Sequence, residues 1–326
     1  MKISSMKIAF VVDPLDSFKI YKDTTFAIMG EAATRGHALF AMEQENLSWR
    51  GGTVYGNARR IHLTGKKPGW YRAEKAADVP LRQFDAVLMR KDPPFDMEYL
   101  YSTYLLELAE LQGARVFNRP RAIRDWNEKM AIARFGKFTA PTVVARREAL
   151  IREFLAKHRD VILKPLDGMG GASVFRVRRD DPNVNVIIET VTHYGRRTIM
   201  AQRYIPEIRD GDKRVLLIGG RAVPHCLARI PKPGETRGNL AAGGAGGARE
   251  LTSRDREIAN ALGPVLAREG LLLVGLDVIG DHLTEVNVTS PTCFQEITGQ
   301  TGFNVAGMFM DALEAACTGP RRKRAK

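Results

Sequence analysis

The stretch VILKPLDGMGGASVFRV, residues 161–177, decides the fold. Lys164 lies within a first apolar run, and a turn-forming segment with Gly168, Gly170 and Gly171 follows it. A second apolar run begins at Ser173. This pattern predicts two strands joined by a glycine-rich loop. Glycines let backbone N–H groups approach phosphate oxygens, and a lysine on a strand adds a fixed positive charge. The spacing matches neither a P-loop nor a dinucleotide-binding GxGxxG, so it indicates a nucleotide lid or an ordinary glycine turn.

Downstream of this segment, the chain reads as short strands punctuated by glycine, typical of an antiparallel α+β half. We expect helices at about 147–158, 253–269 and 303–317. The expected strands are 161–166, 173–177, 197–205, 214–220, 222–230, 271–280 and 282–288.

Upstream, the first 120 residues alternate strand and helix and predict a small open parallel α/β domain. Apolar runs at 7–13, 37–43 and 84–90 are the expected strands, with helices between them and a fourth strand at 114–118. Residues 46–80 lack periodicity and predict hairpin or loop excursions. A helix over 125–136, capped by Asp125 and ended by Gly136, marks the domain boundary.

A second informative segment is GLDVIGDHLTEVNVTSPT, residues 275–292. A hairpin centred on Asp281 places Asp277 opposite Glu285, and strand alternation puts Asn287 on the same face. Two carboxylates and an amide oxygen form an all-oxygen set suited to Mg²⁺ shared with nucleotide phosphates. The rival interpretations are a glycosidase pair of acids, for which nothing else resembles a sugar cleft, and a solvated hairpin face, which the flanking apolar runs oppose.

The segment LARIPKPGETRGNLAAGGAGG, residues 227–247, contains Arg229 and Arg237 among Gly, Ala and Pro residues. Loops of this kind often close over reacting substrates and exclude water, although a plain surface connection is an equal alternative. Arginine suits phosphate or carboxylate because its planar fork makes paired hydrogen bonds, and Arg214 on a neighbouring strand is expected to join the set.

Composition narrows the function classes. The 326 residues carry 50 Lys plus Arg against 37 Asp plus Glu, a net charge of +13 that fits either nucleic acid or small anions. The sequence lacks the interleaved aromatic residues and the helix-turn-helix typical of nucleic-acid-binding proteins, and part of the excess of basic residues lies in the tail RRKRAK. Both observations disfavour nucleic acid as the partner. No apolar run is long enough to span a membrane and no secretory signal is recognised, so we expect no membrane partner and a cytoplasmic location. Three widely spaced cysteines and six unpaired histidines suggest neither zinc nor a disulfide framework.

Taken together, these motifs resemble the bacterial glutathione synthetases, members of the ATP-grasp ligases. The resemblance runs from about Lys7 to about Ala315 and lies in VVDP, MRKDPPFD, NEK, ILKPLDGMGGASVFRV, DGDKRVLL, CLARIP, GETRGNLAAGG and the 275–292 segment. It implies an ATP-grasp fold of mixed α/β and α+β class, with a preATP-grasp domain at 1–124 and an ATP-grasp domain at 125–318. Within the latter, the lid is expected at about 140–203 and the catalytic half at about 204–318, before a basic tail at 319–326.

The resemblance also implies the roles of individual residues. Those expected to bind ATP are Lys129, Lys164, Gly168, Gly170, Gly171, Gln202, Tyr204, Ile205 and Asp212. Those expected to hold the metal, Mg²⁺ with Mn²⁺ as an alternative, are Asp277, Glu285 and Asn287. The expected catalytic arginines are Arg214, Arg229 and Arg237, and the expected substrate-binding residues are Arg90, Asn239, Ser290 and Thr292.

The implied reaction joins γ-L-glutamyl-L-cysteine to glycine with ATP, giving glutathione, ADP and phosphate through an acylphosphate. The implied partners are these small molecules and further copies of the chain in a homotetramer. Another ATP-grasp ligase, for instance one that adds glutamate to a peptide terminus, would share the nucleotide and metal residues but differ in GETRGN and RKDPPFD. A non-enzymatic nucleic-acid-binding protein would explain the charge and would bind in a salt-dependent way that survives loss of the tail.

Overall fold

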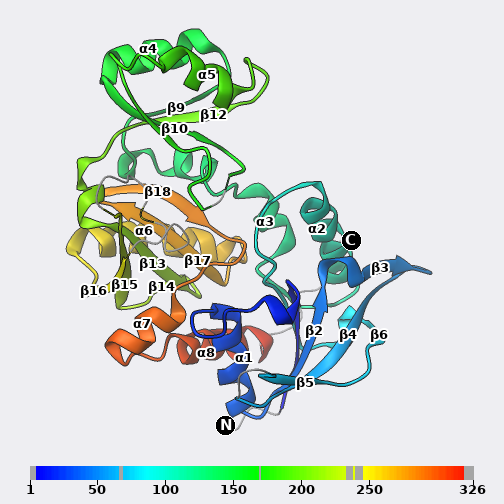
Figure 1. Cartoon of the computed structure of the whole chain (residues 1–326). Coiled ribbons are helices and arrows are strands. Elements are labelled where there is room, and N and C mark those ends of the chain that lie inside the picture. Colours follow the sequence, from blue (N-terminus) through cyan, green and yellow to red (C-terminus); the bar gives the residue numbers. More distant parts are fainter. Residues whose placement is uncertain (1–4, 66–68, 169, 233–237, 239–244, 319–326) are drawn as a thin grey trace.

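The computed structural model describes residues 5–65, 69–168, 170–232, 238 and 245–318, and within them it contains three β-sheets (Figure 1). The N-terminal sheet has the order β3-β4-β2-β1-β7-β8, and β5 and β6 also pair with β4. Its strands are β1 (Lys7–Val12), β2 (Ala38–Glu43), β3 (Leu47–Arg50), β4 (Thr53–Leu63), β5 (Tyr71–Ala73), β6 (Ala77–Pro80), β7 (Ala86–Met89) and β8 (Val116–Phe117).

The centre of the N-terminal sheet is parallel, as predicted, because β1 pairs in parallel with β2 and β7, and β7 with β8. Helices α1 (Thr24–Thr34) and α2 (Met97–Leu111) supply crossovers. Each begins at an aspartate whose carboxylate accepts a backbone N–H, Asp23 from Phe26 and Asp96 from Tyr99. The region of poor periodicity forms β3 to β6, which extend the sheet with antiparallel strands.

The lid sheet is antiparallel and has the order β11-β10-β12-β9. Its elements are β9 (Thr142–Ala145), α4 (Glu148–His158), β10 (Asp160–Pro165), β11 (Phe175–Arg178), α5 (Val184–Thr192) and β12 (Ile199–Arg203). Helix α5 was absent from the sequence-based expectation. Both helices pack on the sheet and form a hydrophobic cluster drawn from the lid alone, which includes Ile151, Leu163 and Ile188.

The catalytic sheet is also antiparallel, with the order β16-β15-β13-β17-β18. Its elements are β13 (Asp212–Ile218), β14 (Arg221–Ala222), β15 (His225–Ile230), β16 (Ala245–Glu250), α6 (Ser253–Arg268), β17 (Leu273–Ile279), β18 (His282–Asn287), α7 (Phe294–Thr301) and α8 (Val305–Thr318). The sequence placed residues 245–247 in a loop, whereas they open β16 and pair with β15. It also missed α7.

The predicted helix over 125–136 is wrong. Helix α3 (Pro120–Asp125) ends at Asp125, and a 3-10 segment follows at Met130–Phe138. The break falls at Trp126, whose φ of −112° and ψ of 63° lie outside the helical region. The Asn127 side chain then accepts the backbone N–H groups of Lys129 and Met130, so it offers the chain an alternative to helical hydrogen bonds.

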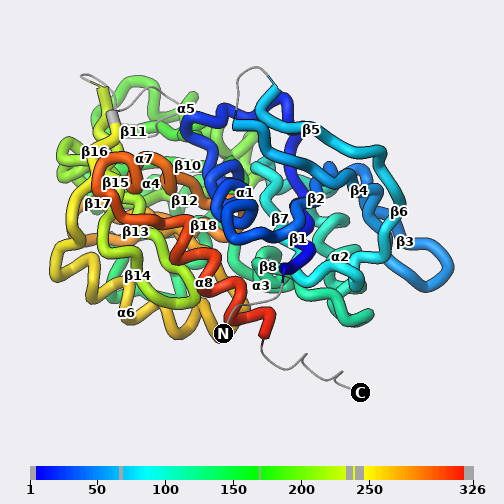
Figure 2. The backbone as a smooth tube through the Cα atoms, turned by 90° about the horizontal axis from the view of Figure 1, so that it is seen from below, coloured from blue at the N-terminus to red at the C-terminus, as the bar shows by residue number. Residues whose placement is uncertain are grey.

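The N-terminal sheet and the catalytic half share one core, whereas the lid has a cluster of its own and joins the core of the catalytic half through Met200. A single hydrophobic cluster contains Ile8 and Phe10 of β1 together with Leu216 of β13 and Phe309 of α8, and Figure 2 shows α8 beside α1. The buried Asn118 adds a polar joint: its Nδ2 donates to the carbonyls of Leu273 (2.7 Å) and Val288 (2.8 Å), and its Oδ1 accepts from Leu273 N (2.9 Å). None of the helices in the described part of the chain is long and apolar enough to cross a membrane.

Candidate active site

A cavity of about 640 Å³ opens where the three sheets meet. Its lining comes from β10, β12 and the glycine loop of the lid, from β13, β15, β17 and β18 of the catalytic sheet, and from the strand ends of the N-terminal domain. Of the predicted site residues, it brings together Arg90, Lys129, Lys164, Gly168, Gly170, Gly171, Gln202, Tyr204, Ile205, Asp212, Arg214, Arg229, Asp277, Glu285, Asn287, Ser290 and Thr292. Arg237 and Asn239 lie outside the described residues.

The β17–β18 hairpin places Asp277 opposite Glu285 and Gly275 opposite Asn287, which confirms the predicted pairing. The predicted turn centre is slightly wrong, since Ile279 pairs with His282 and Val278 with Leu283. A register shift after Asp277 leaves Thr284 as an extra residue, and its hydroxyl donates to the Asp277 carbonyl (3.1 Å). This bulge restores the register that aligns the two carboxylates.

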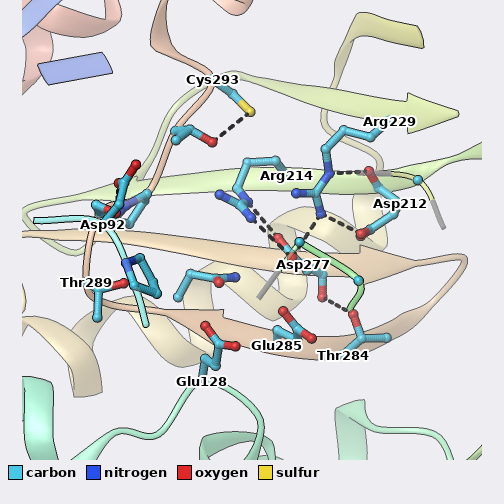
Figure 3. A pocket seen from close by; sticks show the side chains of 18 of the residues that line it. Asp92, Glu128, Asp212, Arg214, Arg229, Asp277, Thr284, Glu285, Thr289 and Cys293 are labelled. Atoms are coloured by element: carbon cyan, nitrogen blue, oxygen red, sulfur yellow. Dashed lines mark hydrogen bonds and ion pairs between the residues drawn. The ribbon is translucent and has the colours of Figure 1, made fainter. Parts of the chain in front are cut away.

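Two arginines hold the Asp277 carboxylate (Figure 3). Arg214 donates from Nε (2.6 Å) and Nη2 (3.2 Å), and Nη2 of Arg229 lies 2.9 Å from the second oxygen. Burial alone would raise the pKa of Asp277, but the two guanidinium groups outweigh it and hold this pKa below its usual range. The pair of arginines therefore fixes an ionised carboxylate in the interior.

Asp212 extends this network of ion pairs, but only one of its two carboxylate oxygens has a hydrogen-bond partner. Its Oδ2 accepts from Arg229 (2.5 Å), while its buried Oδ1 has no hydrogen-bond partner in the described structure. Burial raises the pKa of Asp212 to about 7, against the attraction of Arg229. Asp212 lines the cavity, and a buried carboxylate oxygen without a partner points to a ligand or an ion that completes it.

Two lysines approach the Glu285 carboxylate from the other side of the cavity. Nζ of Lys164 lies 3.6 Å from Glu285 Oε1, and Nζ of Lys129 lies 3.7 Å from the same atom. Lys164 also donates to the Thr284 carbonyl (3.3 Å). Both ammonium groups are buried and stand beyond hydrogen-bonding distance from Glu285, so an anion that enters the cavity has two cations to bind.

Glu128, between Asn127 and Lys129, was missed as a site residue. Its carboxylate pairs closely with Lys129 and faces Glu285 (Figure 3). Burial, and then repulsion from Glu285, raise the pKa of Glu128. Burial opposes the charge on Lys129, but Glu285 and Glu128 outweigh it and raise the lysine pKa. The position of Glu128 in the NEK motif, directly before the predicted phosphate ligand Lys129, is the signal by which the sequence could have identified it.

The glycine loop lies against the same lysine. Lys129 Nζ donates to the Gly168 carbonyl (2.7 Å), which ties the loop to the NEK segment. Gly170 and Gly171 have φ values of 63° and 79°, a left-handed conformation that side chains disfavour. The sequence thus places glycine where the chain turns beside two ammonium groups.

The far end of the cavity is more apolar. Ile162, Tyr204, Ile205, Ile208 and Ile279 line it. Gln202 stands on β12 opposite Ile162 and donates from Nε2 to the Thr142 hydroxyl (3.0 Å). Arg176 stacks on the Tyr204 ring with its guanidinium carbon 3.6 Å from the ring centroid. A flat apolar group fits this end, with charged groups at the other.

The opposite end is formed by the N-terminal domain. Arg90 is buried and donates to the Thr25 hydroxyl (3.2 Å) and the Pro291 carbonyl (3.0 Å). The Ser290 hydroxyl donates to Asp92 (2.5 Å), so its proton is already used in this structure. Lys19, Lys22 and Asp23 also line this end and were missed, because no motif distinguishes them from surface charges.

The three residues predicted to bind the metal suit a hard cation that takes few protein ligands. Asp277, Glu285 and Asn287 offer only oxygens, and both Asp277 oxygens already accept from arginines. No group of three or more His, Cys, Asp or Glu side chains within the described ranges forms a metal site by itself. Mg²⁺ fits such a place, since it commonly binds through one or two carboxylates and completes its shell with phosphates and water.

Comparison with known proteins decides the family. Residues 6–124 match the model of the prokaryotic glutathione synthetase N-terminal domain, and residues 128–302 match that of the prokaryotic glutathione synthetase ATP-grasp domain. The chain belongs to the prokaryotic glutathione synthetase family. As a member of this family of ATP-grasp ligases, it uses ATP and a divalent cation.

Curated relatives agree over nearly the whole chain. A glutathione synthetase of Ralstonia nicotianae is 65% identical over 311 residues, covering 95% of this chain and 96% of the relative. Those of Nitrosomonas europaea and Pseudomonas aeruginosa are 63% and 53% identical, each covering 95% of this chain and 98% of the relative.

Solved structures confirm the ATP-grasp fold. D-cycloserine synthetase DcsG superposes with a TM-score of 0.68 at 17% identity, covering 96% of this chain and all of its own. A RimK domain protein ATP-grasp from Sphaerobacter thermophilus gives a TM-score of 0.60 at 19% identity, covering 94% of this chain and 98% of its own. At such low identity these structures support the fold and not the substrate.

Proposed function

We propose that this chain catalyses the ATP-dependent ligation of γ-L-glutamyl-L-cysteine to glycine, with release of glutathione, ADP and phosphate. The observation that carries the proposal is the meeting of the NEK lysine, the lid lysine and the Asp277–Glu285 hairpin in one cavity. Its setting is a chain 53–65% identical to glutathione synthetases over nearly its full length.

For the nucleotide, we assign the phosphates to Lys129, Lys164 and the loop from Gly168 to Gly171. Two buried cations near one carboxylate, with backbone N–H groups of a glycine loop beside them, match a triphosphate in charge and size. The adenine then occupies the apolar end beside Gln202, Tyr204 and Ile205. The carboxylate of Asp212, which lines the cavity, accepts a ribose hydroxyl.

For the metal, we assign Asp277, Glu285 and Asn287 as ligands, with Mg²⁺ as the cation and Mn²⁺ as its substitute. When bound, the cation neutralises phosphate charge and favours transfer of the γ-phosphoryl group. Glu285 contributes the most available carboxylate, because its lysine contacts are long and a phosphate can take them over.

The side chains of the protein stabilise the negative charges that develop during the reaction. A free carboxylate resists attack by an amine, so the cysteinyl carboxylate must first accept the γ-phosphoryl group as an acylphosphate. Arg214 and Arg229 lie fixed beside Asp277 and stabilise the transferring phosphoryl group and then the oxyanion formed when the glycine amine attacks. The segment around residues 230–247, with Arg237 and Asn239, keeps water from the acylphosphate.

For the dipeptide, we assign the end of the cavity formed by the N-terminal domain. Arg90 and the Ser290–Thr292 turn offer contacts for substrate carboxylates, and Asn239 is assigned to the same work. Since the Ser290 hydroxyl donates to Asp92 in this structure, we expect that bond to exchange when a carboxylate enters. We further propose that the chain works in the cytoplasm as a homotetramer, with its units divided at about residues 124, 140 and 204.

The test is ADP release from ATP and Mg²⁺ with γ-glutamylcysteine, with and without glycine, and with mass detection of the product. ADP formation that requires both substrates and yields glutathione is the expected result. Turnover with another amine or acid, and none with glycine, would overturn the substrate while retaining the ATP-grasp chemistry. Binding of nucleic acid without any turnover would overturn both.

A further inference from the structure

A row of four side chains crosses the lid sheet. The register sets Gln202 of β12 beside Thr142 of β9 on one side and Ile162 of β10 on the other. Ile162 in turn lies beside Arg176 of β11. Val177, the next residue of β11, belongs to the hydrophobic cluster of the lid, so strand alternation puts the row on the opposite face of the sheet. This face is turned toward the cavity, because Ile162 and Gln202 line it, although Arg176 is not among the described residues of the lining.

The carboxylate of Asp160 fixes the guanidinium group of Arg176. Nε of the arginine donates to Oδ1 (3.0 Å) and Nη2 donates to Oδ2 (2.6 Å). Two parallel hydrogen bonds of this kind determine the plane of a guanidinium group as well as its position. Only 24% of the Arg176 side chain is exposed. The lid therefore holds a planar cation in one orientation.

The ring of Tyr204 lies against this guanidinium group. The guanidinium carbon is 3.6 Å from the ring centroid, a distance at which the cation contacts the face of the ring and is attracted by its π electrons. The backbone N–H of Tyr204 donates to the carbonyl of Asp160 (3.0 Å). Asp160 thus holds both members of the stack, Tyr204 through its carbonyl and Arg176 through its carboxylate.

Tyr204 is the member of this stack that reaches the cavity. It is buried and lines the apolar end together with Ile162 and Ile205. A side chain that is ordered before a ligand arrives does not lose rotamer freedom on binding, so it contributes more to affinity than a mobile one. The fixed guanidinium of Arg176 supplies that order to the ring.

We propose that Arg176 is a positioning residue for the base of the nucleotide, acting through the Tyr204 ring against which the base packs. The inference rests on the proposed function, because it takes the apolar end of the cavity as the place of the base. It deepens that function by giving a role to a residue outside the cavity lining. Affinity for a ligand with a planar base then depends on Arg176, whereas affinity for phosphate groups alone does not.

Two other roles are open to an arginine at this position. As a phosphate ligand, Arg176 would have to release Asp160, which already accepts from Nε and Nη2, whereas Lys129 and Lys164 line the cavity directly. As a purely structural cation it would resemble Arg178 on the same strand, whose Nε lies 4.0 Å from the same Asp160 carboxylate. The Arg178 side chain is 65% exposed, so this residue is a control matched in charge, strand and partner.

The first test measures binding by isothermal titration calorimetry, with Mg²⁺ present, for ADP and for inorganic tripolyphosphate, which has phosphates but no base. We expect Arg176→Met to raise the Kd for ADP about 10-fold, the scale of a partly buried cation–π contact, and to change the Kd for tripolyphosphate less than about twofold. Arg178→Met is expected to leave both Kd values within about twofold of wild type. An unchanged Kd for ADP in Arg176→Met, equal losses for the two ligands, or equal losses in the two variants would overturn the inference. A wild type that does not bind ADP would overturn the proposed function as well.

The second test asks whether Arg176 acts through Tyr204. In a Tyr204→Leu background, which lacks the ring, we expect Arg176→Met to cause no further loss of ADP affinity, because both changes remove the same contact. Steady-state kinetics give an independent measure: the KM for ATP is expected to rise about 10-fold in Arg176→Met, with kcat changed less than about twofold. Additive losses in the double variant, or a fall in kcat with an unchanged KM, would contradict a positioning role.

A conservative variant keeps the inference testable if Arg176→Met does not fold. Arg176→Lys retains a cation near the ring but loses the two-point hydrogen bonding to Asp160. Its Kd for ADP is expected to rise about threefold, again with no change for tripolyphosphate. A Kd for ADP equal to that of wild type would show that the fixed plane of the guanidinium group is not needed.

Discussion

The two sides of the cavity hold their charges differently. On the catalytic sheet, Arg214 and Arg229 bind the buried Asp277 at 2.6 and 2.9 Å. On the lid, Lys164 stands 3.6 Å from Glu285 and makes one long hydrogen bond. The first side is a closed network of ion pairs, while the second keeps its cation available for a ligand. The difference indicates that the catalytic sheet is organised before substrates bind and that the lid adjusts when the nucleotide arrives.

The largest expected effect is at Glu285, where the two sides meet. Glu285→Gln keeps the shape of the side chain but removes the charge that the metal and both lysines require. We expect the rate of ADP release to fall by roughly 1,000-fold, the scale at which single electrostatic groups act in catalysis, with little change in circular dichroism. Glu250→Gln, at an exposed position on β16, is the matched control. Activity close to wild type in Glu285→Gln would remove this residue from the metal site.

The next effect contrasts ion pairs in the two regions. Arg214→Leu leaves Asp277 buried with one partner, which typically costs about 3 kcal/mol, so we expect the thermal midpoint to fall by roughly 6 °C or more. Arg176→Leu breaks the partly exposed pair with Asp160 in the lid, where a loss below about 1 kcal/mol is expected. Scanning calorimetry of both variants measures the difference. Equal shifts would show that the two networks are equivalent.

Lys164→Met tests whether the lysine of the lid, unlike the arginines of the catalytic sheet, is available to bind a ligand. The change removes a cation whose protein contacts are long, so we expect kcat/KM for ATP to fall about 100-fold while the melting temperature stays nearly constant. Lys157→Met on the exposed face of α4 serves as control. A large drop in stability with unchanged ATP kinetics would mean that Lys164 is a structural cation.

The smallest effect concerns Asp212 and pH. Its ordinary pKa of 3.8 is raised to about 7 in the fold, so the folded state binds the proton more tightly than the unfolded chain. The resulting stability is present below the unfolded pKa and is lost as the pH rises through about 7. Without ligands, wild type should lose roughly 1 kcal/mol more than Asp212→Asn between about pH 6 and pH 8. Thermal melts of wild type, Asp212→Asn and the control Asp210→Asn across this pH range measure the difference. The expectation would be contradicted if the melting temperatures of all three proteins changed with pH in the same way.

Much of the fold follows from local patterns in the sequence. Fully apolar runs such as residues 8–12 identify parallel strands because they are buried on both faces. The Asp277–Glu285 pairing was predictable because a strand repeats every two residues, so position relative to the turn determines the face.

Other features depend on tertiary contacts that no local pattern records. The break between α3 and the following 3-10 segment arises because the Asn127 side chain accepts the backbone N–H of Lys129 and donates to the Leu166 carbonyl of the lid (3.1 Å). Similarly, nothing in the segment 17–23 identifies it as cavity lining, since Lys19 and Lys22 reach the cavity only through packing of the N-terminal domain on the catalytic sheet. Helix α5 was missed because its β-branched residues resemble a strand.

The hydrogen bonds of Asn118 also affect which parts of the molecule can move relative to one another. Its three hydrogen bonds fasten β8 to the catalytic sheet, and the core shared by those regions reinforces them, whereas the lid has a core of its own and contributes only Met200 to the buried cluster of the catalytic half. Among the three sheets that the structure describes, we therefore expect the lid sheet to tilt most readily against the other two. A pair of spectroscopic labels, one on α4 and one on α6, should therefore report the movement of the lid during turnover as a change in a single distance.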